Sequence, residues 1–142
     1  MPDIRHSIQI AAPLDAVYAL AATAGGFKQW WAEDVTQIND KVELAFFNRN
    51  TIYRLAPVSL AAPNRAEWKC ETGAEWAGTR LVFKLDPTKT GTLLRFTHAD
   101  WAGDTDYFVA CTTTWGELMF RLAAAAEGKG RGPLFLKSSL AY

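Results

Sequence analysis

Residues 107–127 read YFVACTTTWGELMFRLAAAAE, and this stretch decides the fold. Its large residues recur at steps of three and four, so they share one stripe of an α-helix of roughly five or six turns. The stripe consists of Phe108, Cys111, Trp115, Leu118 and Leu122. A helix with one long apolar face has to cover an apolar surface formed by the rest of the chain.

That surface is predicted to be a β-sheet, because the upstream segments alternate apolar and polar residues. In residues 65–71, Ala66, Trp68 and Cys70 face one way, whereas Glu67 faces water with its neighbours. The same alternation predicts strands at residues 4–10, 41–47, 51–60, 79–85 and 92–100. Strands joined by short polar turns favour an antiparallel sheet with one packed and one wet face.

Two short helical segments are expected after the first strand. Pro13 suits the first turn of a helix, and apolar residues at helical spacing follow it to Ala21. Gly25 and Gly26 are predicted to end this helix. Residues 27–33 form a second short helical or irregular piece.

These elements predict an α+β fold that occupies residues 1–142 as a single domain. A curved antiparallel sheet of six to seven strands wraps around the long C-terminal helix. Where a strongly twisted sheet and its covering helix diverge, a cleft lined by aromatic side chains can form, and such clefts are ordinary small-molecule sites.

Three motifs in this order resemble the SRPBCC (START-like) superfamily. They are IQIAAPLDAVY at residues 8–18, FKQWW at residues 27–31, and TWGELMFRL at residues 114–122 with Gly128 after it. The branch that this chain resembles is that of activators of the heat-shock-protein ATPase. The resemblance implies the helix-grip fold and a cavity between sheet and closing helix, and it supplies no universal catalytic residue. For the activator branch, it also implies docking on a protein partner.

The composition argues against several function classes. Fifteen basic and fifteen acidic residues balance, so no net field favours nucleic acid. Two histidines and two cysteines form no zinc-type spacing, and we expect neither a metal nor a cofactor. The longest apolar tract, residues 122–126, is too short to span a bilayer, and no secretory signal opens the chain. A soluble cytoplasmic protein is expected.

The candidate ligand-binding residues are side chains that the strand and helix phases direct inward, with polar groups among them. The predicted set is Trp31, Phe46, Tyr53, Trp68, Phe83, Phe96, His98, Phe108, Cys111, Thr112, Trp115 and Leu118. Their aromatic bulk would supply affinity, and His98, Tyr53, Tyr107 or Thr112 would orient the ligand. The alternative is that these side chains simply fill a core, since protein interiors are close-packed.

Three functions fit this sequence. The first is a small binding protein that encloses an apolar or aromatic molecule between the sheet and the C-terminal helix. The second is an interaction module like the chaperone-ATPase activators. The third is an enzyme resembling polyketide cyclases, with His98 as acid or base. The tail 132–142 carries Leu134, Phe135, Leu136 and Leu140 and is apolar enough to pack on the body or on a second copy. A homodimer is therefore compatible with the sequence, which does not fix the oligomeric state.

Overall fold

The computed structural model describes residues 1–137, and in this range the chain forms one antiparallel sheet of seven strands and three helices. The strand order is β1-β7-β6-β5-β4-β3-β2. The elements are β1 (Ile4–Ile10), α1 (Leu14–Ala22), α2 (Ala24–Trp30), β2 (Asp34–Ile38), β3 (Lys41–Phe46), β4 (Thr51–Ala61), β5 (Arg65–Cys70), β6 (Arg80–Thr88), β7 (Gly91–Ala99) and α3 (Asp106–Ala126). The predicted α+β helix-grip architecture is confirmed.

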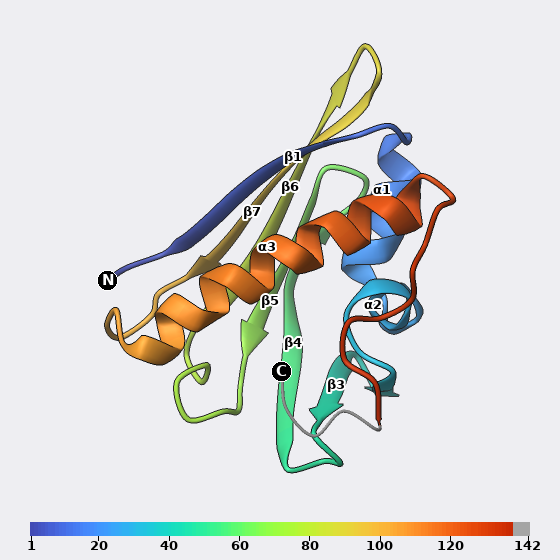
Figure 1. Ribbon diagram of the computed structural model, residues 1–142. Coiled ribbons are helices and arrows are strands. Elements are labelled where there is room, and N and C mark those ends of the chain that lie inside the picture. Colours follow the sequence, from blue (N-terminus) through green and yellow to red (C-terminus); the bar gives the residue numbers. More distant parts are fainter. Residues whose placement is uncertain (138–142) are drawn as a thin grey trace.

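The long helix α3 crosses one face of the sheet obliquely, and its C-terminal end reaches α1 (Figure 1). Its first turn is capped by Thr105, whose hydroxyl accepts a hydrogen bond of 3.2 Å from the Phe108 N–H. The buried residues of the helix follow the stripe read from the sequence: Cys111, Trp115, Leu118, Met119, Leu122 and Ala123. One face of α3 therefore packs against the sheet and the two short helices.

The two short helices meet at Thr23 rather than at a glycine. The helix α1 ends at Ala22, and the Thr23 hydroxyl begins α2 by accepting a hydrogen bond of 2.9 Å from the Gly26 N–H. The prediction that Gly25 and Gly26 end the first helix is therefore wrong. Gly26 lies inside α2 because the two helices touch there: a Cβ would sit 2.2 Å from the Ala19 carbonyl oxygen.

The edge strand β2 was not identified from the sequence. Only Val35 is buried in it, so the apolar alternation that marks the other strands is too weak to detect. In the part of the chain that the structure describes, no helix is long and apolar enough to cross a membrane. Leu140 of the apolar tail lies outside the described residues.

The core between the sheet and α3 is aromatic and closely packed. Phe96 lies 4.2 Å from Trp115 and 5.0 Å from Phe83 between ring centroids. The indole N–H groups of Trp30 and Trp68 donate to the carbonyl oxygens of Leu20 and Ala21, each at 2.9 Å. These bonds satisfy buried polar groups and fix the end of α1 against the sheet.

Candidate functional site

A pocket of about 330 Å³ lies beneath the N-terminal half of α3, next to the β3–β4 hairpin. It is the space that the aromatic core does not fill. Its walls come from the end of α2, the β3–β4 hairpin, the loop between β5 and β6, α3 and the C-terminal segment. The lining residues are Trp31, Phe46, Phe47, Thr51, Tyr53, Trp76, Tyr107, Ala110, Cys111, Thr114, Trp115, Leu118 and Phe135.

The pocket exists because α3 presents small side chains at this end. Ala110, Cys111 and Thr114 line the pocket within about one turn of the helix. Farther along the helix, Trp115 and Leu118 also line it. The opposite walls are aromatic but rigidly held, so they do not collapse into the volume. Small residues on the helix against large rings on the sheet leave the space open.

One wall is a stacked pair of rings from two distant segments. Tyr53 of β4 and Trp76 of the β5–β6 loop lie 4.0 Å apart with an angle of 3° between their planes. Gly73 makes this stack sterically possible. Its φ is +106°, and a Cβ there would lie 2.7 Å from Cε1 of Tyr53. The loop therefore needs glycine at this position to deliver Trp76 to the pocket.

The C-terminal segment supplies another wall. Phe135 packs edge-on against Phe46 at 5.1 Å and against Phe47 at 5.9 Å. Its backbone is held to the end of α2: the Phe135 N–H donates to the Trp31 carbonyl at 3.0 Å, and the Glu33 N–H donates to the Phe135 carbonyl at 2.9 Å. These bonds position the Phe135 ring as one side of the pocket.

The polar groups of the pocket gather where α3 begins. The hydroxyls of Tyr53 and Tyr107 are hydrogen-bonded to each other. Burial, partly offset by this bond, raises the pKa of Tyr53 to about 12, and burial likewise raises the pKa of Tyr107. Burial also raises the pKa of the Cys111 thiol, although Trp76 and Tyr107 oppose that rise. At neutral pH all three groups are therefore uncharged.

A carboxylate lies just behind this polar corner. Glu75 accepts a hydrogen bond of 2.6 Å from the Thr105 hydroxyl, which ties the β5–β6 loop to the start of α3. The negative charge of Glu75 contributes to the raised pKa values of Tyr53 and Cys111. Glu75 therefore makes ionisation of these two groups less favourable.

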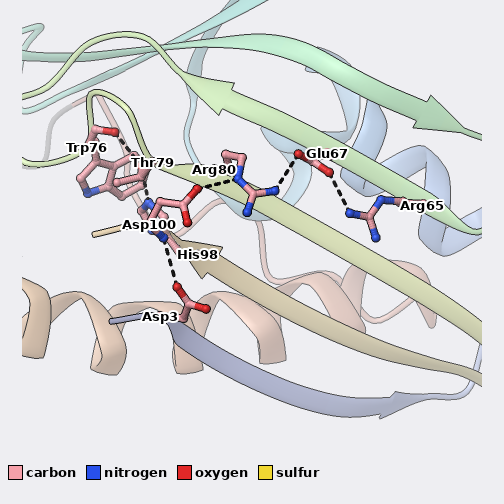
Figure 2. A network of polar contacts seen from close by, with 8 residues as sticks. All are labelled: Asp3, Arg65, Glu67, Trp76, Thr79, Arg80, His98 and Asp100. Atoms are coloured by element: carbon pink, nitrogen blue, oxygen red, sulfur yellow. Dashed lines mark hydrogen bonds and ion pairs between the residues drawn. The ribbon is translucent and has the colours of Figure 1, made fainter. Parts of the chain in front are cut away.

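His98 lies outside the pocket, behind Trp76 and Trp115. The Trp115 indole can only donate, and it does so to His98 Nδ1 at 3.1 Å. The proton of neutral His98 is thus on Nε2, which donates to Thr79 Oγ1 at 2.8 Å. Thr79 in turn donates to the Trp76 carbonyl at 2.6 Å, as Figure 2 shows. Burial lowers the pKa of His98 to about 3, so the ring is neutral and both nitrogens are used.

A second polar network, also drawn in Figure 2, joins β5, β6 and the end of β7. Glu67 accepts from Arg65 at 2.8 Å and from Arg80 at 2.9 Å, and Arg80 also donates to Asp100 at 2.7 Å. The expectation that Glu67 faces water is wrong, since Glu67 is buried beneath these arginines. Burial alone would raise its pKa, but the hydrogen bonds from Arg65 and Arg80 outweigh burial and lower it.

The predicted site residues separate into two groups. Those that line the pocket are Trp31, Phe46, Tyr53, Cys111, Trp115 and Leu118. Those outside its lining are Trp68, Phe83, Phe96, His98, Phe108 and Thr112.

Each residue of the second group has other partners. Trp68, Phe83 and Phe96 fill the core, and Phe108 packs on Trp101 at 5.2 Å. The Thr112 hydroxyl donates to the Val109 carbonyl at 2.6 Å. A ligand-binding role stays a prediction for all twelve.

Several pocket residues were missed by sequence reasoning. Trp76 lies in a loop, where neither strand nor helix phase says which way a side chain points. Ala110 and Thr114 were missed because small residues do not stand out in a search for aromatic walls. The two glycines that flank Trp76, at positions 73 and 78, were the available signal that this loop carries a precisely placed ring.

Metal-ligating side chains do not gather at one place in the described part of the chain. Within residues 1–137, no group of three or more histidine, cysteine, aspartate or glutamate side chains is placed to hold a metal ion. The polar corner of the pocket offers hydroxyls and a thiol with raised pKa values, which are poor ligands for a cation at neutral pH.

Comparison with known proteins adds solved structures to this description. No family model matches the chain, and no curated protein matches it at a significant level. A structure described as the Aha1 dimer from Colwellia psychrerythraea is 27% identical, with 91% of this chain and 98% of that chain covered and a TM-score of 0.80. The AHSA1-like protein from Aeromonas hydrophila is 13% identical, with 89% and 93% covered and a TM-score of 0.69.

A third similar structure is DynU16, described as a putative protein in the dynemicin biosynthetic locus. It is 15% identical with a TM-score of 0.73, and the match covers 94% of this chain and 50% of that one. These similarities confirm the resemblance to the SRPBCC superfamily and its AHSA-like branch that the sequence motifs predict.

Proposed function

We propose that this protein binds an apolar or aromatic small molecule in the pocket beneath α3. The observation that carries the proposal is an open volume of about 330 Å³ whose described lining contains aromatic, aliphatic, hydroxyl and thiol groups and no charged side chain. Burying such a ligand removes apolar surface from water, which supplies the affinity. The few hydroxyls at one end supply orientation.

The volume sets the size of the ligand. Pockets for small molecules span roughly 300–1,000 Å³, so this one lies at the small end. An engineered cavity of about 150 Å³ in another protein holds one benzene molecule. The pocket here is about twice that size. A molecule with two rings, or an aliphatic chain of similar bulk, is the natural occupant.

The geometry favours binding over acid–base catalysis. His98 would be the proton-transfer group of the cyclase-like alternative, but Trp76 and Trp115 lie between it and the pocket. Both ring nitrogens are engaged in hydrogen bonds, and a pKa of about 3 keeps the ring neutral. A general base needs a pKa near the working pH and contact with its substrate.

The neutral dye Prodan, which has a two-ring naphthalene core, tests this proposal, because its emission rises in apolar sites. We expect saturable binding to the wild-type protein and loss of binding in Ala110→Trp, where an exposed position at the pocket gains a ring. The matched control is Thr113→Trp, which adds the same ring to an exposed position of α3 outside the lining. Equal binding by all three proteins, or by none, would overturn the proposal.

A homodimer is the second candidate, because the 27% identical structure from Colwellia psychrerythraea is described as a dimer. Phe120 is 64% exposed and Val109 is 56% exposed. They lie on one side of α3, about 16 Å apart along the helix axis. Light scattering at rising protein concentration would detect a dimer, and Phe120→Asp is expected to dissociate it. A wild-type monomer up to millimolar concentration would rule this assembly out and leave docking on a chaperone or other partner as the remaining interaction alternative.

A further inference from the structure

The polar corner of the pocket has a specific hydrogen-bonding capacity. Tyr53 and Tyr107 carry two hydroxyl protons, and the bond between them uses one. The second proton bonds the Cys111 sulfur, which is a weak acceptor, or else water or a ligand, since Tyr107 is 39% exposed. The pair can therefore donate one hydrogen bond to a bound molecule, and its remaining lone pairs can accept one.

The pair is held rigidly, so it can select for ligand geometry. The Tyr53 ring is clamped by its stack on Trp76 and is 8% exposed. Tyr107 lies in the first turn of α3, next to the cap that Thr105 forms, and its side chain is 39% exposed. A buried hydroxyl and a half-exposed one thus meet at the pocket wall. Neither has to be ordered when a ligand arrives.

The electrostatics of the pocket discriminate between charge states. The described lining offers no cationic side chain to pair with an anion and no carboxylate to pair with a cation. Burying an unpaired charge is costly, so a fatty-acid carboxylate or a phenolate is disfavoured. A cation would gain from the aromatic faces, but it too would be buried without a paired charge, because Glu75 accepts from Thr105 and lies outside the lining. A neutral ligand suffers neither penalty.

We propose that the Tyr53–Tyr107 pair anchors an uncharged two-ring ligand through one hydroxyl or carbonyl oxygen. This inference rests on the proposed function and adds the chemical class of the ligand, which is neutral and bicyclic and carries one oxygen at the end next to the start of α3. The rings of the ligand lie against Trp31, Phe46 and Phe135 while its oxygen bonds the tyrosine pair. Tyr53 and Tyr107 are binding residues in this proposal and take part in no chemical step.

Calorimetric titration with four compounds that share the naphthalene ring system tests the proposed chemical class of the ligand. They are naphthalene, 2-naphthol, 2-naphthoate and a 2-naphthylmethyl trimethylammonium salt, which differ in polar group and charge. At pH 7 we expect 2-naphthol to bind roughly tenfold more tightly than naphthalene, as one neutral hydrogen bond allows. The carboxylate and the ammonium are expected to bind more weakly than naphthol.

The tyrosine pair is tested by Tyr53→Phe and Tyr107→Phe, which keep the rings and remove one hydroxyl each. We expect the double variant to bind naphthalene as the wild type does and to lose the preference for naphthol. Tyr18→Phe on α1, outside the lining, is the matched control and should keep the preference.

The outcomes separate the two proposals. If naphthalene binds and naphthol shows no preference, the anchor is wrong and the pocket function stands. If the carboxylate or the ammonium binds best, the neutral class is wrong. Failure of all four compounds to bind would count against the proposed function itself.

Discussion

The two ends of the space beneath α3 are built from the same kinds of residue, yet one is filled and the other is open. Toward α1, the side chains of Trp68, Phe83 and Phe96 lie beneath the helix and are almost fully buried. Toward the β3–β4 hairpin, aromatic rings of similar size surround a pocket of about 330 Å³. The aromatic content of a segment therefore does not decide whether it forms a core or a cavity.

What differs between the ends is the helix. Its C-terminal half presents Met119 and Leu122, which are buried and fill the space beneath the helix. Its N-terminal half presents Ala110, Cys111 and Thr114 at the pocket, and these stop short of the rings opposite. A void arises where the side chains of one element are small and those of the facing element are not large enough to reach them.

Truncating a ring at each end gives the largest expected effect. Trp68→Ala should lower the free energy of unfolding by about 4–5 kcal/mol, because it opens a cavity in a packed core and leaves the Ala21 carbonyl without its donor. Phe46→Ala, whose ring already borders open volume, should cost roughly half as much. Urea denaturation measures both. Equal losses would show that the pocket end is packed as tightly as the core.

Acid should destabilise the core next to the pocket through His98, which contacts Trp76 and Trp115. Its folded-state pKa is lowered to about 3, so as the pH falls below about 6.5 the unfolded chain binds a proton that the folded chain refuses. The stability that this residue contributes is present above that pH and is lost as the pH falls toward 3. Between pH 7 and pH 4.5 the loss should be roughly 2–3 kcal/mol.

The measurement is urea denaturation across that pH range. His98→Gln, which cannot titrate, should show a flatter dependence than the wild type. A wild-type stability that stays level between pH 7 and pH 5 would show that His98 is protonated in the folded protein and that its ring nitrogens are not engaged as described.

Enlarging a small residue should destabilise the protein at the packed end and stabilise it at the pocket end. Ala123→Leu adds bulk where α3 is buried against the core and should cost about 1–3 kcal/mol by overpacking. Thr114→Leu adds bulk at the pocket and should stabilise by about 0.5–1 kcal/mol while weakening ligand binding. Thermal unfolding with and without ligand measures both effects. A destabilising Thr114→Leu would show that the pocket is narrower than its lining indicates.

The sequence predicts the fold well because the elements that define it carry strong periodic signals. The stripe on α3 and the alternation in β1, β5, β6 and β7 each repeat several times, and burial enforces one phase. The edge strand β2 escapes prediction because a strand at a sheet edge buries little and needs little alternation. The glycines of α2 mislead because helix contact, rather than a helix end, explains Gly26.

The site is predicted only in part, since strand phase shows which residues face inward but not whether space remains there. Phe96 and Tyr53 have the same inward phase, yet the first is in the core and the second is at the pocket. Trp76 and Phe135 come from irregular segments, whose side-chain direction depends on tertiary hydrogen bonds such as that from Phe135 to Trp31. Such contacts have no local sequence pattern.

The fixed tautomer of His98 gives the protein an intrinsic NMR probe. An imidazole proton that is held on Nε2 by Thr79 and shielded from water exchanges slowly enough to give a separate downfield resonance in a proton NMR spectrum. Its chemical shift depends on the bonds from Trp115 and to Thr79, and through Thr79 on the Trp76 carbonyl. Because the rings of Trp76 and Trp115 also form pocket walls, a ligand that moves either ring would shift this one line without touching the histidine.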